Sequence, residues 1–217
     1  MMWNVFLVIV AYLLGSIPSA VWISKKYYGI DIREYGSKNA GATNVLRVLG
    51  KRAALPVFAL DMAKGFVAVQ LAHLSTFMQG SEAMFIFKII LVAAVVLGHI
   101  FPLFAGFRGG KGVATLAGSV LGVYPPAVLL CLATFLVVLL ITHYVSVSSM
   151  TAGIMFPIYT YFVFGERSRV LIIFACVVAV LLIITHRKNI KRLIDGTESK
   201  LYIFRKRPFR PRRRDIE

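Results

Sequence analysis

The first apolar run of the chain, "WNVFLVIVAYLLGSIPSAVWIS" at residues 3–24, indicates a membrane protein. As a helix it is long enough to cross about 30 Å of hydrocarbon. It is too long for the core of a cleavable signal peptide, and no basic stretch precedes it, so we expect a retained membrane helix. The whole chain agrees, because 59% of its residues are hydrophobic and only 16% are charged, against about 25% charged in soluble domains.

Further apolar runs follow the first one and predict an all-α integral membrane protein. The runs lie at residues 3–24, 53–78, 84–105, 112–123, 125–142, 147–164 and 168–186. The fourth is short, and Pro125 and Pro126 separate it from the fifth, because proline ends a helix and restricts the residue before it. We therefore expect about seven transmembrane helices in a single polytopic domain at residues 1–198, followed by a basic tail at 199–217.

The distribution of lysine and arginine predicts the orientation in the membrane. The formal net charge is +16, and basic residues are concentrated at residues 25–52 and after His186. Loops rich in lysine and arginine stay in the cytoplasm, which places the N-terminus outside and the C-terminus in the cytoplasm, although the two arginines of "FGERSR" weakly oppose the pattern. Topology and anionic lipid headgroups account for the charge, so membrane lipids are expected partners and nucleic acid is not.

Three polar segments collect on the predicted cytoplasmic face, and "THYVSVSS" at 142–149 joins them. The first, "GSKNAGATNVLR" at 36–47, combines glycines that allow tight turns with hydrogen-bonding side chains and Arg47, whose forked guanidinium suits phosphate. The alternative is a polar loop between helices that only caps them.

The second segment, "FRGGKGVAT" at 107–115, reads as a glycine turn followed by a helix from Gly112 onward. The first N–H groups of a helix have no partner within it and attract anions, so this turn predicts a phosphate site with Lys111 as its charge. It is not a nucleotide-binding P-loop, whose glycine spacing is longer. The alternative is a re-entrant loop whose lysine only marks the cytoplasmic side.

The third segment, "HRKNIKRLIDGTE" at 186–198, puts His186 and Asn189 on one helix face. Its lysines and arginines are typical of the basic end of a final transmembrane helix. Within the apolar runs, Asp61 and Lys64 are expected to pair across one helical turn, and His99 to bond between helices, because ionisable groups are costly there.

The sequence lacks the motifs of several well-known kinds of catalytic and metal site. No histidine is followed by aspartate at the acyltransferase spacing His-x-x-x-x-Asp, and there is no Gly-x-Ser-x-Gly elbow. Cys131 and Cys176 stand alone in apolar runs, which suits small core residues rather than a metal site. The predicted cytoplasmic face is therefore better suited to binding anions than to metal-assisted or carboxylate-based chemistry.

Together these segments resemble one family, the bacterial acyl-phosphate:glycerol-3-phosphate acyltransferases, or PlsY family. The likeness is carried by 36–47, by "GHIFPLFAGFRGGKGVAT" at 98–115 and by 186–198, with support from "GSIPSA" at 15–20 and "LDMAKG" at 60–65. The resemblance implies a multi-pass enzyme of the bacterial inner (plasma) membrane with its site on the cytoplasmic side. It would transfer a fatty acyl group from acyl phosphate to the 1-hydroxyl of sn-glycerol 3-phosphate. The products would be lysophosphatidic acid and phosphate, in the first acylation of phospholipid biosynthesis.

The resemblance also implies roles for individual residues. Catalytic roles are expected for Ser37, Arg47, Lys111, His186 and Asn189. Substrate-binding roles are expected for Asn39, Gly41, Thr43, Asn44, Gly109, Gly110, Gly112 and Ser146. Structural roles are expected for Asp61, Lys64, His99 and Glu198, the last as a brace for the basic tail. No metal ion, cofactor or obligate protein partner is implied.

Within this set, the acyl-phosphate headgroup is expected at Ser37, Asn39, Gly41 and the backbone of 109–112. Glycerol 3-phosphate is expected at Arg47, Lys111, His186 and Asn189, and the proton acceptor is either His186 or a phosphate of the substrate. The rival interpretation is a small transporter of organic phosphates, since broken helices and helix N-termini aimed at anions also occur there. The halves of the chain show no internal repeat of the kind that many transporters have.

Overall fold

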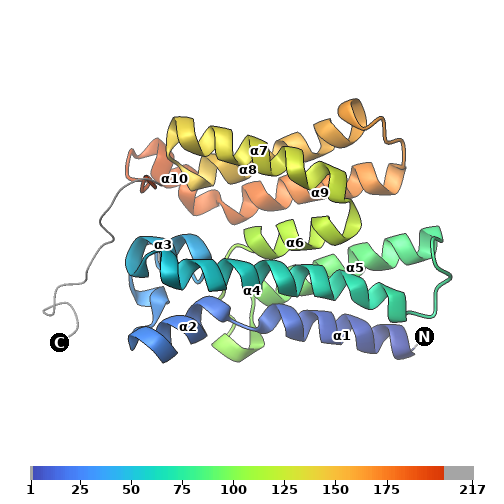
Figure 1. Ribbon diagram of the computed structural model, residues 1–217, viewed down its shortest axis with the longest axis horizontal. Coiled ribbons are helices and arrows are strands. Elements are labelled where there is room, and N and C mark those ends of the chain that lie inside the picture. The colour runs from blue at the N-terminus through green and yellow to red at the C-terminus, as the bar shows by residue number, and fades with distance from the viewer. Residues whose placement is uncertain (1, 203–217) are drawn as a thin grey trace, which may run out of the picture. The chain divides into compact units, whose positions relative to one another are not determined.

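The computed structural model describes residues 2–202 and shows helices without strands across that range (Figure 1). Residues 2–123 form one compact unit and Tyr124–Tyr202 another. The first unit contains α1 (Met2–Ser16), α2 (Ser19–Tyr28), η1 (Ile32–Glu34), α3 (Ala42–Leu49), α4 (Lys51–Gln70), η2 (Leu71–Leu74), α5 (Glu82–Ile100), η3 (Leu103–Ala105) and α6 (Val113–Val123). The second contains α7 (Pro125–Thr142), α8 (Val145–Ile158), the π-helical turn η4 (Tyr159–Val163), α9 (Arg169–Thr185) and α10 (Arg187–Ile194).

Every apolar run of the sequence is helical, but the helices differ in their ability to cross a membrane. Among the described residues, four spans are long and apolar enough: Met2–Tyr28, Lys51–Leu74, Glu82–Ala105 and Pro125–Thr142. A fifth is obtained if α9 and α10, bent by 56° at His186, count as one. Helices α6 and α8 have 11 and 14 residues, which is short for about 30 Å of hydrocarbon. Seven crossings, their orientation and the single domain at 1–198 stay predictions, and residues 203–217 of the predicted tail lie outside the described residues.

The run at 3–24, which we expected to be one helix, is interrupted at Ile17 and Pro18. Helix α1 ends at Ser16 and α2 begins at Ser19, because proline lacks an N–H and restricts the residue before it. The interruption takes the carbonyl of Ile17 out of a regular helix, and this carbonyl accepts a hydrogen bond of 3.0 Å from Lys64 Nζ. The break is therefore part of the polar interior of this unit.

Glycines let the long helices of the first unit approach backbone to backbone. A Cβ on Gly98 of α5 would collide with the carbonyl of Tyr12 in α1, and one on Gly65 of α4 with the carbonyl of Thr115 in α6. Packing through small residues is typical of helices in membranes, where lipid tails are as apolar as leucine. This packing fixes the start of α6 against α4, which matters for the site.

A small buried core joins the loop after α2 to the rest of the first unit. Val21, Ile32, Val45, Val48 and Val57 come from α2, η1, α3 and α4 and are at most 4% exposed. Burial of such side chains stabilises by about 1.5–3 kcal/mol each. The polar segment at 36–47 is thus held between two anchored elements.

Candidate active site

The side chain of Asn44 holds the loop at 36–44 in shape. Its Nδ2 donates to the carbonyls of Ile32 (3.0 Å) and Tyr35 (2.9 Å), and its Oδ1 accepts from the N–H of Ser37 (2.9 Å). Asn44 is 1% exposed, and both of its amide donors are engaged within the chain. We therefore propose a positioning role for Asn44 in place of the substrate contact that the sequence suggested.

The same loop carries the other residues predicted in the first segment. Gly36 has φ +59°, and a Cβ there would collide with Asn44 Oδ1, so the loop needs glycine at this point. Helix α3 begins after Gly41, and Arg47 lies in its last turn. Lys38 of this segment is exposed, and the polar side chains of Ser37, Asn39, Thr43 and Arg47 are partly accessible.

Two N–H groups of the glycine turn at 109–112, which we expected to face a substrate phosphate, are bonded within the protein instead. The N–H groups of Gly109 and Gly110 donate to the carbonyls of Ile100 and His99, both at 3.2 Å. They are therefore occupied by the end of α5 and do not point at a ligand. A Cβ on Gly110 would collide with His99 Nε2 and approach the carbonyl of Ala40 to 2.8 Å, so glycine is needed here for close packing within the protein.

A helix does follow the turn, as predicted. Gly112 has φ +78° and its carbonyl accepts the N–H of Leu116 at 2.7 Å, so α6 begins at Val113. The N–H groups of residues 113–115 precede this first helical bond and have no acceptor within the helix. Lys111, which is partly buried, lies in the turn immediately before them.

A cluster of buried polar side chains lies beneath the turn. Asp61 Oδ1 accepts from Ser19 Oγ (2.6 Å) and pairs with Lys64 Nζ (2.8 Å), while His99 Nδ1 lies 3.1 Å from Thr115 Oγ1. Asp61, Lys64 and His99 are at most 7% exposed. The predicted ion pair across one helical turn and the predicted interhelical bond of His99 are both confirmed. Gly109 and Gly110 line a small cavity together with this cluster.

In the second unit, Glu198 collects three donors. Asn189 Nδ2 (2.6 Å) and Ser146 Oγ (2.9 Å) donate to its Oε1, and Arg192 Nε (2.8 Å) donates to its Oε2. Burial raises the pKa of this carboxyl, but the hydrogen bonds from Asn189, Ser146 and Arg192 outweigh it, so the pKa lies below its ordinary value. Glu198 therefore joins α8 to α10 through Ser146, Asn189 and Arg192, while its predicted role as a brace for the tail at 199–217 stays a prediction.

His186 lies at the bend between α9 and α10 and is 2% exposed. Its Nδ1 is 2.7 Å from the carbonyl of Leu182. A carbonyl can only accept, so Nδ1 carries a proton and Nε2 is the nitrogen that can accept one when the ring is neutral. The carbonyl of His186 accepts the N–H of Asn189 at 2.8 Å, which confirms that the two residues are one helical turn apart.

The model of one protein family, "Glycerol-3-phosphate acyltransferase", matches residues 5–196, which include the helices from α2 to α10 but not Glu198. The chain belongs to the glycerol-3-phosphate acyltransferase family. The family's glycerol-3-phosphate acyltransferase from Chlorobaculum tepidum is 42% identical over an alignment of 227 positions, which covers 92% of this chain and 97% of that protein. The one from Thermoanaerobacter sp. is 46% identical over 200 residues, covering 92% and 96%.

Two solved structures of the family share the fold. One is PlsY, an integral membrane glycerol 3-phosphate acyltransferase, in its glycerol 3-phosphate form, with a TM-score of 0.79, 42% identity, and coverage of 92% of this chain and 96% of that one. The other is the lysophosphatidic acid form, with a TM-score of 0.77, 41% identity, and coverage of 92% and 95%. This chain is thus similar to an integral membrane protein over both of its compact units.

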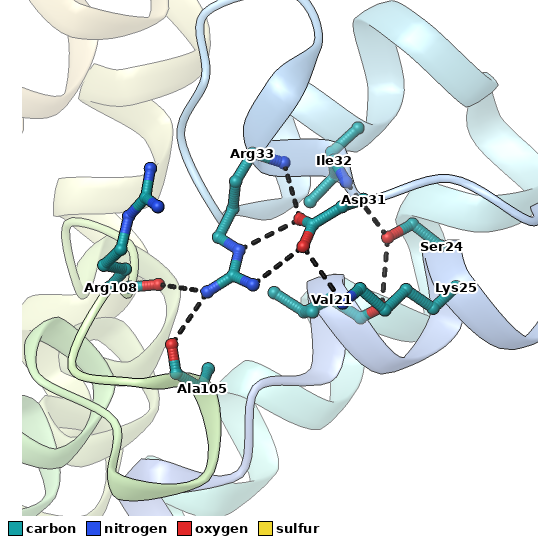
Figure 2. Close-up of polar contacts among 8 residues, drawn as sticks. All are labelled: Val21, Ser24, Lys25, Asp31, Ile32, Arg33, Ala105 and Arg108. Atoms are coloured by element: carbon teal, nitrogen blue, oxygen red, sulfur yellow. Dashed lines mark hydrogen bonds and ion pairs between the residues drawn. The ribbon is translucent and has the colours of Figure 1, made fainter. Parts of the chain in front are cut away.

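Sequence reasoning missed two residues of this family member, Asp31 and Arg33. Figure 2 shows Arg33 against the carboxylate of Asp31, with Nε to Oδ1 at 2.9 Å and Nη2 to Oδ2 at 2.7 Å. Lys25 Nζ pairs with the same carboxylate at 3.2 Å. The signal is a carboxylate two residues before an arginine in a loop whose basic residues, at 25–52, we used, apart from Arg47, only to predict the topology.

The buried ion pair of this acyltransferase-family chain yields a stability prediction. Lys64→Met should be strongly destabilising, because removing one partner of a buried pair leaves an uncompensated charge at a cost of about 3–5 kcal/mol. The double variant Asp61→Asn/Lys64→Met carries neither charge and should recover more than half of that loss. Apparent unfolding temperatures of the parent, both single variants and the double variant in one detergent measure this. Strictly additive effects would contradict the coupling.

A second prediction concerns pH. Because the folded-state pKa of Glu198 is lowered, its stabilising contribution is complete above the ordinary value near 4.5 and is lost as the pH falls through the folded pKa. Glu198→Gln should therefore unfold several degrees below the parent at neutral pH, and the gap should close in acid. Unfolding temperatures between pH 8 and pH 3 measure the gap, with Glu82→Gln, at an exposed position in α5, as the control. A gap that stays constant in acid would be inconsistent with this role.

Proposed function

We propose that the chain transfers a fatty acyl group from acyl phosphate to the 1-hydroxyl of sn-glycerol 3-phosphate. The family supports the acceptor, and the similar solved structures are described as the glycerol 3-phosphate and lysophosphatidic acid forms. Acyl phosphate as the donor rests on the resemblance of segments 36–47, 98–115 and 186–198. The loop charges support a site on the cytoplasmic side of a bacterial inner membrane.

The observation that carries the proposal is the contact between two polar segments of the first unit. Gly110 packs against His99 and the carbonyl of Ala40 so closely that a Cβ would collide with both. This packing joins the segment that bears Ser37, Asn39 and Arg47 to the turn that bears Lys111. Donors and cations from both segments are what a site for phosphorylated substrates needs.

The chemistry needs no cofactor, because acyl phosphate is an activated mixed anhydride. The 1-hydroxyl oxygen attacks the acyl carbon, the bond from that carbon to the phosphate oxygen breaks, and phosphate leaves with the electron pair. The resemblance implies that the hydroxyl proton passes to His186 or to an oxygen of a substrate phosphate. Fixed donors and cations stabilise the negative charge that develops on the carbonyl oxygen, and alignment of the hydroxyl supplies much of the remaining acceleration.

The structure refines the roles that we propose. Lys111 and the first N–H groups of α6 replace the N–H groups of Gly109 and Gly110 as the phosphate contacts in this turn. The hydroxyl of Ser146 donates to Glu198 at 2.9 Å, so we assign Ser146 to the support of Asn189 rather than to direct contact with substrate. The bond between Asn189 and Glu198 in turn supports α10, the short helix that follows His186.

The proposed activity is tested with purified protein in lipid vesicles. Given acyl phosphate and glycerol 3-phosphate, the protein should release phosphate and form lysophosphatidic acid in equal amounts. Acyl-CoA in place of acyl phosphate should give no product. Passage of glycerol 3-phosphate across the vesicle without acylation would instead support a transporter and reject the enzyme.

Lys111→Ala should lower kcat/KM on the order of tenfold to a hundredfold. The reason is that a hydrogen bond to a charged group is worth about 1.5–3 kcal/mol, and about 1.4 kcal/mol corresponds to a factor of ten in rate. Steady-state kinetics with each substrate varied in turn measure the change. Lys26→Ala removes the same charge from the exposed end of α2 and is the control. If kcat/KM of Lys111→Ala, like that of the control, stays within about threefold of the parent, Lys111 does not contact a substrate phosphate.

A further inference from the structure

Arg33 connects two segments that are far apart in sequence. Its Nη1 donates to the carbonyl of Ala105 at 2.7 Å and, more distantly, to that of Arg108 at 3.4 Å. Its Nε and Nη2 both donate to the carboxylate of Asp31. Figure 2 shows the guanidinium between the carboxylate on one side and the two carbonyls on the other. We call this arrangement of Asp31, Arg33 and the two carbonyls the Arg33 bridge.

The Arg33 bridge differs from an ordinary surface ion pair. The side chains of Arg33 and Asp31 are only 17% and 12% exposed, and the bidentate geometry fixes the plane of the guanidinium. Asp31 also accepts the backbone N–H of Arg33 at 3.0 Å and pairs with Lys25. The hydrogen bond from Arg33 holds the pKa of Asp31 well below its usual range, so the carboxylate stays charged at neutral pH.

The bridge holds a turn with an unusual backbone. Gly106 and Phe107 lie between the two bridged carbonyls and have φ +63° and φ +58°. A positive φ is uncommon for a residue other than glycine and costs free energy unless the surroundings enforce it. The chain then continues directly into Gly109, Gly110 and Lys111. Arg33 therefore holds two carbonyls immediately before the point at which Gly109 and Gly110 pack on His99.

We propose that Arg33 is a positioning residue, which sets the place of Lys111 by holding the carbonyls of Ala105 and Arg108. This inference rests on the proposed function, because Arg33 would affect catalysis through Lys111, which we propose contacts a substrate phosphate. Arg33 itself touches no substrate in this proposal. A lysine at this position would mark the cytoplasmic side of the membrane equally well, but one ammonium cannot bind a carboxylate bidentately and also reach two carbonyls.

The test uses the full chain in one detergent, with the variants Arg33→Lys and Arg33→Ala. The matched control is Lys25→Ala, which removes another cation from the same carboxylate without touching the turn; the side chain of Lys25 is 56% exposed. Two measurements are made on each protein. Hydrogen exchange of the peptide covering 105–112 reports the order of the turn, and steady-state kinetics report kcat and KM for glycerol 3-phosphate and for acyl phosphate.

Both Arg33 variants should exchange faster over 105–112 than the parent. Arg33→Ala should lower kcat/KM on the order of tenfold or more, and the KM that rises should belong to the same substrate as in Lys111→Ala. A role limited to general stability would instead reduce the active fraction and lower the apparent kcat with KM unchanged. Arg33→Lys should recover only part of the loss, and Lys25→Ala should match the parent in both measurements.

Three results would overturn the proposal: Arg33→Lys equal to the parent in exchange and kinetics, faster exchange with unchanged kcat/KM, or lower activity with unchanged exchange. If Arg33→Ala fails to fold, Arg33→Lys decides the matter, because it retains the charge and loses only the geometry. If the parent shows no acyl transfer, the proposed function fails, while the exchange measurement still shows whether Arg33 orders the turn.

Discussion

The ion pair between Asp61 and Lys64 places charge inside helices that are otherwise apolar, and much of the first unit is arranged around it. An isolated charge in such surroundings is costly, so it must be paired and hydrogen-bonded. The interruption of the first span at Pro18 supplies the carbonyl of Ile17 to Lys64 and the hydroxyl of Ser19 to Asp61. The same cluster includes His99, whose ring and carbonyl both meet Gly110. His99 thus connects the buried ion pair to the glycine turn, because it lies beside Asp61 and also contacts Gly110.

Two carboxylates beside the basic segments, Asp31 and Glu198, are engaged within the protein, which would leave other cations of these segments for the phosphorylated substrates that we propose. Asp31 is engaged by Arg33 and Lys25, and Glu198 by Arg192. Because each of these carboxylates has a lowered pKa, both remain negative at neutral pH and order the basic segments without binding substrate. Such fixed cations attract anions at little cost in reorganisation.

Much of the fold could be predicted from the sequence, because hydropathy is a local property and membrane helices satisfy their own backbone. Each apolar run is mostly helical, and the helix after Gly112 begins where the glycines indicate. The interruption at Pro18 and the bend at His186 were not predicted, since a proline can break a helix without always doing so and a bend leaves no local signal in the hydropathy. Pro56, by comparison, lies inside α4 without ending it.

The site was predicted less completely, for a related reason. Residue types indicated which segments are polar, but not which donors the protein uses itself. The amide of Asn44 and the N–H groups of Gly109 and Gly110 suit a phosphate in the sequence, yet tertiary contacts have already engaged them. Conversely, Arg33 looked like one more basic residue until its acceptors were known. Residue types identify candidate donors, and only the fold shows which of these donors are already hydrogen-bonded within the protein.

Two buried hydroxyls that donate to carboxylates, those of Ser146 and Ser19, are not activated as nucleophiles, which agrees with the direct transfer that we propose. A nucleophilic serine needs a neighbouring base that takes its proton. Ser146 donates to Glu198, but the lowered pKa of that carboxyl makes it a weak base, and it also accepts from Asn189 and Arg192. Ser19 donates to Asp61, which Lys64 neutralises. Neither hydroxyl is therefore activated, whereas an acyl phosphate is already activated. If acyl phosphate is the donor, as we propose, it needs only to be held and aligned, and the donors and cations of segments 36–47 and 107–115 suit that task.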